Sequence, residues 1–298
     1  MKRIKTLTVT IITLAAVCAA AFAAHAAGSY TVLYGFAFDV QNGGAVIHDY
    51  DERSSEVTLP NTLLGKNVIR IDDSAFFGKT RITDITLESA EHLNSIGSSA
   101  FCGCSALRSI DIPDSVESVG FGAFQDCVSL ETASLGNGMT AIAAQTFYNC
   151  DSLKTVIVPD SVQTVGAYAF GGCESLRWVK IPDSVTQIGT GAFSGSDNAV
   201  ICCYSGSGAH NYAVENGINY LLLDELKRGD VNADGFVNIN DVTVIQRHLA
   251  ELERINEIFN GAADADCDGK LDITDATAIQ MYLAEYDITY PVGQPMGR

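Results

Sequence analysis

The sequence predicts a mixed fold, in which a solenoid of stacked, parallel short strands is followed by a small all-α unit with two loop–helix motifs. Two observations predict it. From residue 101 to residue 193 a phenylalanine recurs every 23 residues, and an acidic loop followed by a helical segment occurs twice, 34 residues apart. A fixed period of this length is typical of a solenoid, whose coils bury their apolar faces only against neighbouring coils.

The repeat forms columns of equivalent residues. The phenylalanines are Phe76, Phe101, Phe124, Phe147, Phe170 and Phe193. Four of them are followed three residues later by a cysteine, and then by a leucine after three more: Cys104, Cys127, Cys150 and Cys173; Leu107, Leu130, Leu153 and Leu176. The apolar alternation that ends each coil predicts one short strand per coil. We expect the three columns to lie inside the stack, although disulfides between neighbouring coils are an alternative for the cysteines.

Most coils end in a Pro-Asp-Ser-Val turn, and one has Leu135-Gly-Asn-Gly instead. With its Phe, Cys and Leu columns, this pattern resembles the BspA-like (treponemal-type) leucine-rich-repeat family. The resemblance implies a leucine-rich-repeat solenoid with an N-terminal cap at 27–65, repeats at 66–197 and a C-terminal cap at 198–223 that contains a short helix and strand. Caps are needed because an open coil would expose apolar surface and strand edges.

Two acidic loops near the C-terminus share one spacing. Each has oxygen-bearing side chains at positions 1, 3, 5, 9 and 12 and glycine at position 6, which is typical of an EF-hand-like calcium loop whose position 7 binds through its carbonyl. The sequence therefore predicts two Ca²⁺ ions, although solvated acidic loops are the alternative. The predicted ligands are Asp230, Asn232, Asp234, Phe236, Asn238 and Asp241 for one ion, and Asp264, Asp266, Asp268, Lys270, Asp272 and Asp275 for the other.

The duplicated loop–helix resembles the type I dockerin family over 229–290, because Gly229 and Asp230 open it, aspartate stands at position 12 and both helices end in Leu-Ala-Glu. The resemblance implies docking onto a cohesin module of a scaffoldin, chiefly in cellulosomes. It also implies the cohesin contacts: Ile239, Asn240, Gln246, Arg247, Ile273, Thr274, Gln280 and Met281. The usual Ser/Thr pair is absent there, which indicates a divergent cohesin. The near-symmetry of the halves leaves a single or a dual binding mode open.

Residues 224–228 are expected to be a short linker, and 291–298 a tail without assigned structure. The N-terminus predicts a signal peptide over 1–26, with a basic start, an apolar run and a small-x-small cleavage site; an uncleaved membrane anchor is the alternative. No later apolar run approaches the roughly 20 residues of a spanning helix. The protein is therefore expected to be secreted, without membrane insertion, and to be attached to a cell-surface cellulosome.

Charge and motifs disfavour other functions. The net charge of −18 becomes about −21 once Lys2, Arg3 and Lys5 leave with the signal peptide, which disfavours nucleic acid as a partner. No Gly-x-Ser-x-Gly or His-Glu-x-x-His motif is present, so we expect no enzyme activity. The alternatives are an adhesin anchored by its dockerin, and an unrecognised enzyme or inhibitor.

The repeat surface offers one possible ligand site, at Trp178 and Lys180. Both occupy outward positions of a predicted strand, and an exposed aromatic side chain there would suit an unknown protein or carbohydrate ligand. The alternative is a tryptophan that packs against the C-terminal cap.

Overall fold

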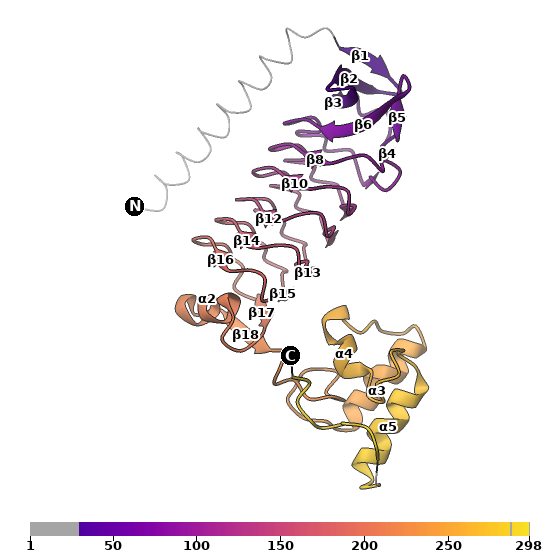
Figure 1. Ribbon diagram of the computed structural model, residues 1–298, viewed down its shortest axis with the longest axis vertical. Coiled ribbons are helices and arrows are strands. Elements are labelled where there is room, and N and C mark those ends of the chain that lie inside the picture. The colour runs from indigo at the N-terminus through magenta and orange to yellow at the C-terminus, as the bar shows by residue number, and fades with distance from the viewer. Residues whose placement is uncertain (1–29, 287, 298) are drawn as a thin grey trace. The chain divides into compact units, whose positions relative to one another are not determined.

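The computed structural model describes residues 30–286 and 288–297 (Figure 1). The chain folds into two compact units. One comprises the described residues up to Val179 together with Ser184–Ala199, and the other comprises Lys180–Asp183 and the residues from Val200 onward. The predicted signal peptide lies outside the described residues. In the described part of the chain, no helix is long and apolar enough to cross a membrane.

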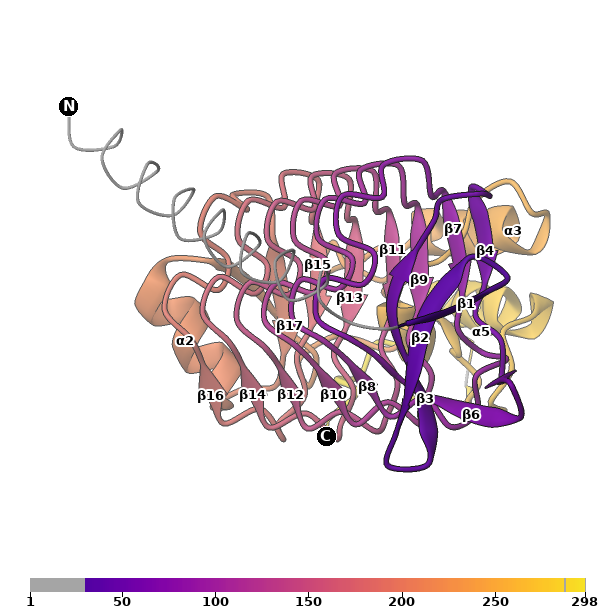
Figure 2. The same cartoon turned by 90° about the horizontal axis from the view of Figure 1, so that it is seen from above.

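The first unit is a solenoid whose coils contribute two short strands each (Figures 1 and 2). One row of parallel strands consists of β4 (Glu56–Thr58), β7 (Asp84–Thr86), β9 (Ser109–Asp111), β11 (Thr132–Ser134), β13 (Thr155–Ile157) and β15 (Trp178–Lys180). The other row consists of β8 (Ser95–Ile96), β10 (Ser118–Val119), β12 (Ala141–Ile142), β14 (Thr164–Val165) and β16 (Gln187–Ile188). The prediction of one strand per coil is wrong, because the coils also contain a strand of the second row. A strand of two residues is too short to show an alternation of apolar and polar residues in the sequence.

The predicted columns lie inside the stack. The core phenylalanine rings follow one another at centroid distances of 4.9 to 5.7 Å, and the column cysteines are fully buried. Each column cysteine is a free thiol that donates a hydrogen bond to the carbonyl of a core phenylalanine, at 3.1 or 3.2 Å. Ser196 takes the place of cysteine in the last coil and donates to Phe170 O at 2.6 Å.

The residue two positions after each core phenylalanine has a left-handed backbone. These residues are Gly78, Gly103, Asp126, Asn149, Gly172 and Gly195, with φ between 57° and 81°. Glycine, asparagine and aspartate adopt this conformation at the lowest cost, because other side chains clash with the following carbonyl. The sequence thus specifies a sharp turn at the same point of every coil.

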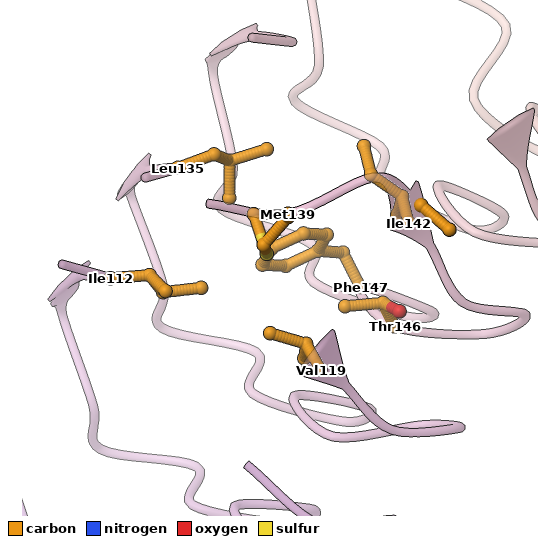
Figure 3. A pocket seen from close by; sticks show the side chains of 8 residues that line it. Ile112, Val119, Leu135, Met139, Ile142, Thr146 and Phe147 are labelled. Carbon is orange, nitrogen blue, oxygen red and sulfur yellow. The ribbon is translucent and has the colours of Figure 1, made fainter. Parts of the chain in front are cut away.

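In the coil that has Leu135-Gly-Asn-Gly in place of the proline turn, two glycines pack against the backbone of the preceding coil. A Cβ on Gly136 or Gly138 would lie 2.4 or 2.3 Å from a carbonyl oxygen of the preceding coil, so only glycine allows this approach. An apolar cavity of about 10 Å³ remains beside it, lined by residues that include Ile112, Val119 and Met139 (Figure 3). The missing proline turn therefore costs some packing but does not interrupt the stack.

The N-terminal cap is a sheet of β1 (Thr31–Leu33), β2 (Phe36–Gln41), β3 (Gly44–Tyr50) and β6 (Lys66–Ile71), with β5 (Thr62–Leu63) beside β6. Buried His48 on β3 lies between two carboxylates. Its Nδ1 is 2.8 Å from Asp72 and its Nε2 is 2.9 Å from Asp39. Burial alone would lower the pKa of His48, but the two carboxylates outweigh it and hold the pKa above its ordinary value.

From Val200 onward the second unit contains β17 (Val200–Cys203), α2 (Gly208–Asn216) and β18 (Asn219–Leu222), and β17 and β18 pair in parallel. This confirms the expected short helix and strand. Ser207 caps the start of α2, and Gly217 ends it with a left-handed backbone.

The remainder of the unit contains α3 (Ile239–Leu249), the 3₁₀ helix η1 (Glu257–Phe259), α4 (Asn260–Ala263) and α5 (Ile273–Leu283). Helices α3 and α5 bury Val242 and Ile245, and Ala276 and Ile279. The tail, which the sequence left unassigned, returns to the start of this region: Met296 N donates to Leu226 O at 2.9 Å.

Candidate metal centre

Each acidic loop ends by capping a helix. Asn238 precedes α3 and Asp272 precedes α5, and each forms a capping box with the aspartate three residues later. Asp241 Oδ2 accepts from Asn238 N at 2.8 Å, and Asp275 Oδ2 accepts from Asp272 N at 2.9 Å. Loop positions 9 and 12 therefore fix the point at which each helix begins.

The first loop curls around the carboxylate of Asp230, which is 1% exposed. Its oxygens accept from Asp234 N at 3.1 Å and from Gly235 N at 2.9 Å. Asn232 Oδ1 accepts from the same Asp234 N at 2.9 Å, so positions 1 and 3 face one N–H group, and Asp234 Oδ2 at position 5 accepts from Asn232 Nδ2 at 3.1 Å. Gly235 has a φ of 87°, which explains the glycine at position 6.

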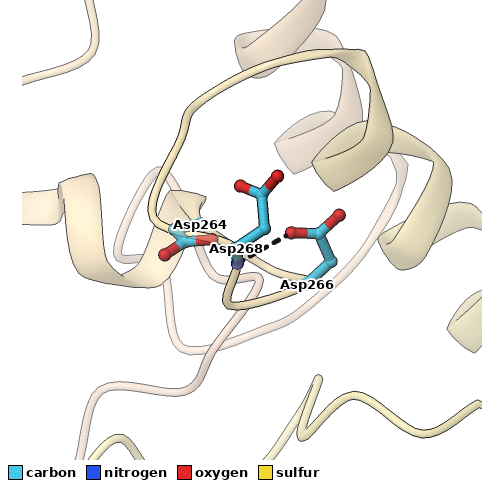
Figure 4. Close-up of side chains that lie close together, drawn as sticks. All are labelled: Asp264, Asp266 and Asp268. Atoms are coloured by element: carbon cyan, nitrogen blue, oxygen red, sulfur yellow. Dashed lines mark hydrogen bonds between the residues drawn. The ribbon is translucent and has the colours of Figure 1, made fainter.

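The second loop gathers three carboxylates. Asp264, Asp266 and Asp268 each offer an oxygen, and these oxygens lie within 4.8 Å of one another (Figure 4). Ligands of one Ca²⁺ ion lie 2.3 to 2.6 Å from it, so two of them are at most about 5 Å apart. Asp264 Oδ1 is buried and has no hydrogen-bond partner in the described residues. This spacing and the unpartnered oxygen fit a hard divalent cation.

The loop carboxylates form no direct ion pair with a lysine, arginine or histidine in the described part of the chain. Asp241 and Asp275 are nevertheless fully buried. Burial raises the pKa of Asp230, Asp241 and Asp275, and backbone N–H groups offset part of this effect. Asp272 is half-buried, and bonds from the backbone and hydroxyl of Thr274 lower its pKa.

The predicted ligands therefore fall into two groups. Oxygens of positions 1, 3 and 5 converge in the second loop, and positions 1 and 3 of the first loop accept from one N–H group. Positions 9 and 12 bond the backbone at the start of each helix. At position 7 of the first loop, Phe236 O accepts from Asn238 Nδ2 at 3.3 Å. At position 7 of the second loop, Lys270 N donates to Asp268 Oδ1 at 2.8 Å.

Two basic residues of the predicted linker also belong to the loops. Lys227 Nζ donates to Gly235 O at 3.0 Å, and Arg228 Nη1 donates to Asp264 O at 2.6 Å. Sequence reasoning missed both contacts. The signal that could have revealed them is the pair of adjacent basic residues directly before an acidic loop.

The eight predicted cohesin contacts are all exposed on α3 and α5. Ile239 is 59% and Ile273 56% exposed, so two large apolar side chains occupy equivalent places on the two helices. Arg247 forms an ion pair with Glu253 at 2.9 Å, whereas its counterpart Met281 carries no charge. The two halves are thus similar in backbone but different in surface chemistry.

On the repeats, Trp178 and Lys180 are half-buried and flank buried Val179, as expected for outward positions of a strand. The guanidinium of Arg177 lies 5.5 Å from the centre of the Trp178 ring, within the range of a cation–π contact.

Comparison with known families agrees with both halves of the sequence prediction. Residues 69–200 match the BspA type leucine rich repeat region in 6 copies, and residues 228–284 match the dockerin type I domain. Both are domains of non-catalytic types, type I dockerin domains bind calcium, and a dockerin implies a cohesin partner. No curated protein matches the chain.

Several solved leucine-rich-repeat proteins are similar to the chain. That of T. pallidum is 24% identical, with a TM-score of 0.43, over 65% of this chain and 82% of that one. A leucine rich cell surface protein of Faecalibacterium prausnitzii is 23% identical, with a TM-score of 0.49, over 59% of this chain and 55% of that one. A protein of Bacteroides capillosus is 24% identical, with a TM-score of 0.34, over 51% of this chain and 97% of that one.

Proposed function

We propose that this chain, which joins a BspA-type leucine-rich-repeat region to a type I dockerin domain, is a secreted, non-catalytic protein that docks onto a cohesin module of a scaffoldin. Docking depends on calcium and displays the repeats outside the cell, on a cell-surface cellulosome that degrades polysaccharide. The proposed division is a signal peptide at 1–26, caps and repeats over 27–223, a linker at 224–228 and the dockerin at 229–290.

The observation that carries this proposal is the duplicated acidic loop, whose carboxylates form no ion pair in the described residues and converge in the second copy. Asp230, Asn232 and Asp234 would hold one Ca²⁺ ion, and Asp264, Asp266 and Asp268 the other, completed by positions 7, 9 and 12 of each loop. Calcium supplies the positive charge that these carboxylates lack. Because positions 9 and 12 also begin α3 and α5, holding the loops in shape holds both helices in place.

The two helices then present one docking surface each. Ile239 and Ile273 are the largest exposed apolar groups at the helix starts, and an apolar side chain ringed by polar residues is typical of an interface centre. Because Arg247 and Met281 differ, we infer that the two halves bind cohesin unequally even where both orientations are possible.

Calorimetric titration against a panel of cohesins, in calcium and then in EDTA, tests the proposal. We expect tight binding to a cohesin in calcium and none in EDTA. Replacing both Ile239 and Ile273 by Asp should abolish binding and leave calcium affinity unchanged, whereas Val214→Asp, at an exposed position of α2, should change neither. Unchanged cohesin binding by the double variant refutes the surface, and absence of calcium binding refutes the proposal.

A further inference from the structure

Three exposed or half-buried aromatic side chains lie at the turns that follow the second row of strands. Phe121 follows β10, Tyr148 follows β12 and Tyr168 follows β14. These three strands belong to successive coils (Figure 1). Phe121 is 44% and Tyr168 41% exposed, and the rings of Tyr148 and Tyr168 meet edge to face at 6.4 Å. We call these three residues the aromatic edge.

The tyrosines of the aromatic edge rest on glycines of the next coil. A Cβ added to Gly191 would lie 2.7 Å from the Tyr168 ring, and one added to Gly171 would lie 3.1 Å from the Tyr148 ring. Each tyrosine ring therefore packs against the backbone of a glycine, where any larger residue would displace it. Rings fixed in this way lose little freedom when a ligand binds, which favours binding.

The turns of the aromatic edge contain no charged residue, although the chain contains 36 acidic and 18 basic residues. One carboxylate borders them: Asp126 N donates to Tyr148 O at 2.8 Å, and Asp126 Oδ1 accepts from Asn149 Nδ2 at 2.9 Å. No charged residue occurs in the four segments that form these turns: 118–125, 139–149, 161–172 and 184–196. Their exposed or half-buried polar groups are amides and hydroxyls, such as Gln145, Thr190 and Ser194. These segments offer no lysine or arginine to pair with an anionic ligand, and their amides and hydroxyls suit a ligand with apolar ring faces and neutral hydroxyl edges.

The coil spacing sets the distance between the aromatic side chains. The core rings Phe124, Phe147 and Phe170 of the same three coils stack at 5.5 and 5.7 Å. Phe121 and Tyr168 belong to coils two apart, so they lie on the order of 10 Å from each other along the stack. A disaccharide unit of an extended, β-linked sugar chain has about this length. The separation of Phe121 and Tyr168 along the stack therefore matches one repeat unit of such a polymer.

We propose that the aromatic edge binds a neutral, extended β-linked polysaccharide that runs along the coils, with Phe121 and Tyr168 stacking on its sugar rings. The inference deepens the proposed function, since it names the ligand class that the docked repeats would present. It rests on that function for its setting only, because the binding residues lie in the repeat unit and not in the dockerin.

Affinity electrophoresis of the full mature chain tests the proposal, with hydroxyethylcellulose, xyloglucan and glucomannan as neutral probes and carboxymethylcellulose as the charged one. The test variant combines Phe121→Ala with Tyr168→Gln. Both substitutions introduce residues that already occur at these positions of the repeat: the intervening coil has Ala144 where Phe121 stands and Gln145 where Tyr168 stands. Tyr34→Gln is the matched control: Tyr34 is 68% exposed and, like Tyr168, has a positive φ, but it lies in the N-terminal cap.

We expect at least one neutral polymer to retard the wild-type chain and Tyr34→Gln equally, and the double variant to bind about tenfold more weakly or worse, as for a pair of aromatic anchors. Carboxymethylcellulose should not retard the chain. The inference is overturned if no neutral polymer binds, which leaves a protein as the occupant of the aromatic edge, or if the double variant binds like wild type. Cohesin binding by the same variants, measured in parallel, reports the dockerin separately.

Discussion

Replacing Cys150 tests whether the thiol column stabilises the solenoid by hydrogen bonding or by volume alone. Cys150 is fully buried, and its Sγ donates to Phe124 O at 3.2 Å. An alanine loses that hydrogen bond, at about 1 kcal/mol, and leaves a hole of roughly one heavy atom, at about 1 kcal/mol more. Cys150→Ala should therefore lower the free energy of unfolding by about 2 kcal/mol.

Cys150→Ser should cost less than about 1 kcal/mol, because the hydroxyl keeps the bond. The stack already contains this arrangement at Ser196, whose Oγ donates to Phe170 O and accepts from Cys173 N at 2.9 Å. If the thiol contributed only volume, the serine variant would instead be less stable than the alanine variant, because burying an unpaired hydroxyl costs more than burying a methyl group.

The assay is urea unfolding followed by the fluorescence of Trp178, which is the chain's single tryptophan and lies in the same unit. The matched controls are Cys267→Ser and Cys267→Ala at the exposed cysteine, which should leave the Trp178 transition unchanged. A serine variant that unfolds at the same or lower urea concentration than the alanine variant would refute the reasoning.

Three further predictions follow from burial and charge. In the native state iodoacetamide should modify Cys267 alone, because the other seven described cysteines are buried and burial raises the pKa of Cys104 and Cys173 to about 12; mass spectrometry that finds disulfides or several labelled sites contradicts this. The stability contributed by His48 should be complete below its ordinary pKa of 6.5 and be lost as pH rises through the raised folded value. His48→Gln should remove that decline from thermal unfolding curves at pH 6 to 9, and an unchanged decline would show another group to be responsible. Calcium should bind the second loop more tightly, because five aspartates occupy its ligand positions against three in the first. In a calcium titration Asp264→Asn should therefore weaken the tighter step and Asp230→Asn the weaker one; the reverse assignment would contradict the charge argument.

The features that the sequence predicts well are those that repeat. The Phe, Cys and Leu columns recur at a fixed spacing, so their burial follows from the pattern, and the two loops identify each other by duplication. The second row of strands was missed because a two-residue strand such as β12 buries a single side chain and has no period to detect.

Contacts that occur once are not encoded in a local pattern. His48, Asp39 and Asp72 come from separate strands or their ends, and only the pairing of β2, β3 and β6 brings them together. The same holds for the tail: Val292 is an isolated apolar residue in a polar segment, and its burial depends on the return of the chain to Leu226. Such contacts depend on the folded topology, which cannot be deduced from local patterns in a single sequence.

The two parts of the chain are stabilised in physically different ways. The coils bury stacked rings and thiols whose hydrogen bonds are complete without any ion. The loops instead bury Asp241 and Asp275 with backbone partners but no cation, so their folding has an electrostatic cost that a bound cation would remove. On the proposed function, calcium would therefore control docking while the repeats keep their fold. A ligand held by the aromatic edge would remain bound when the chain leaves its scaffold.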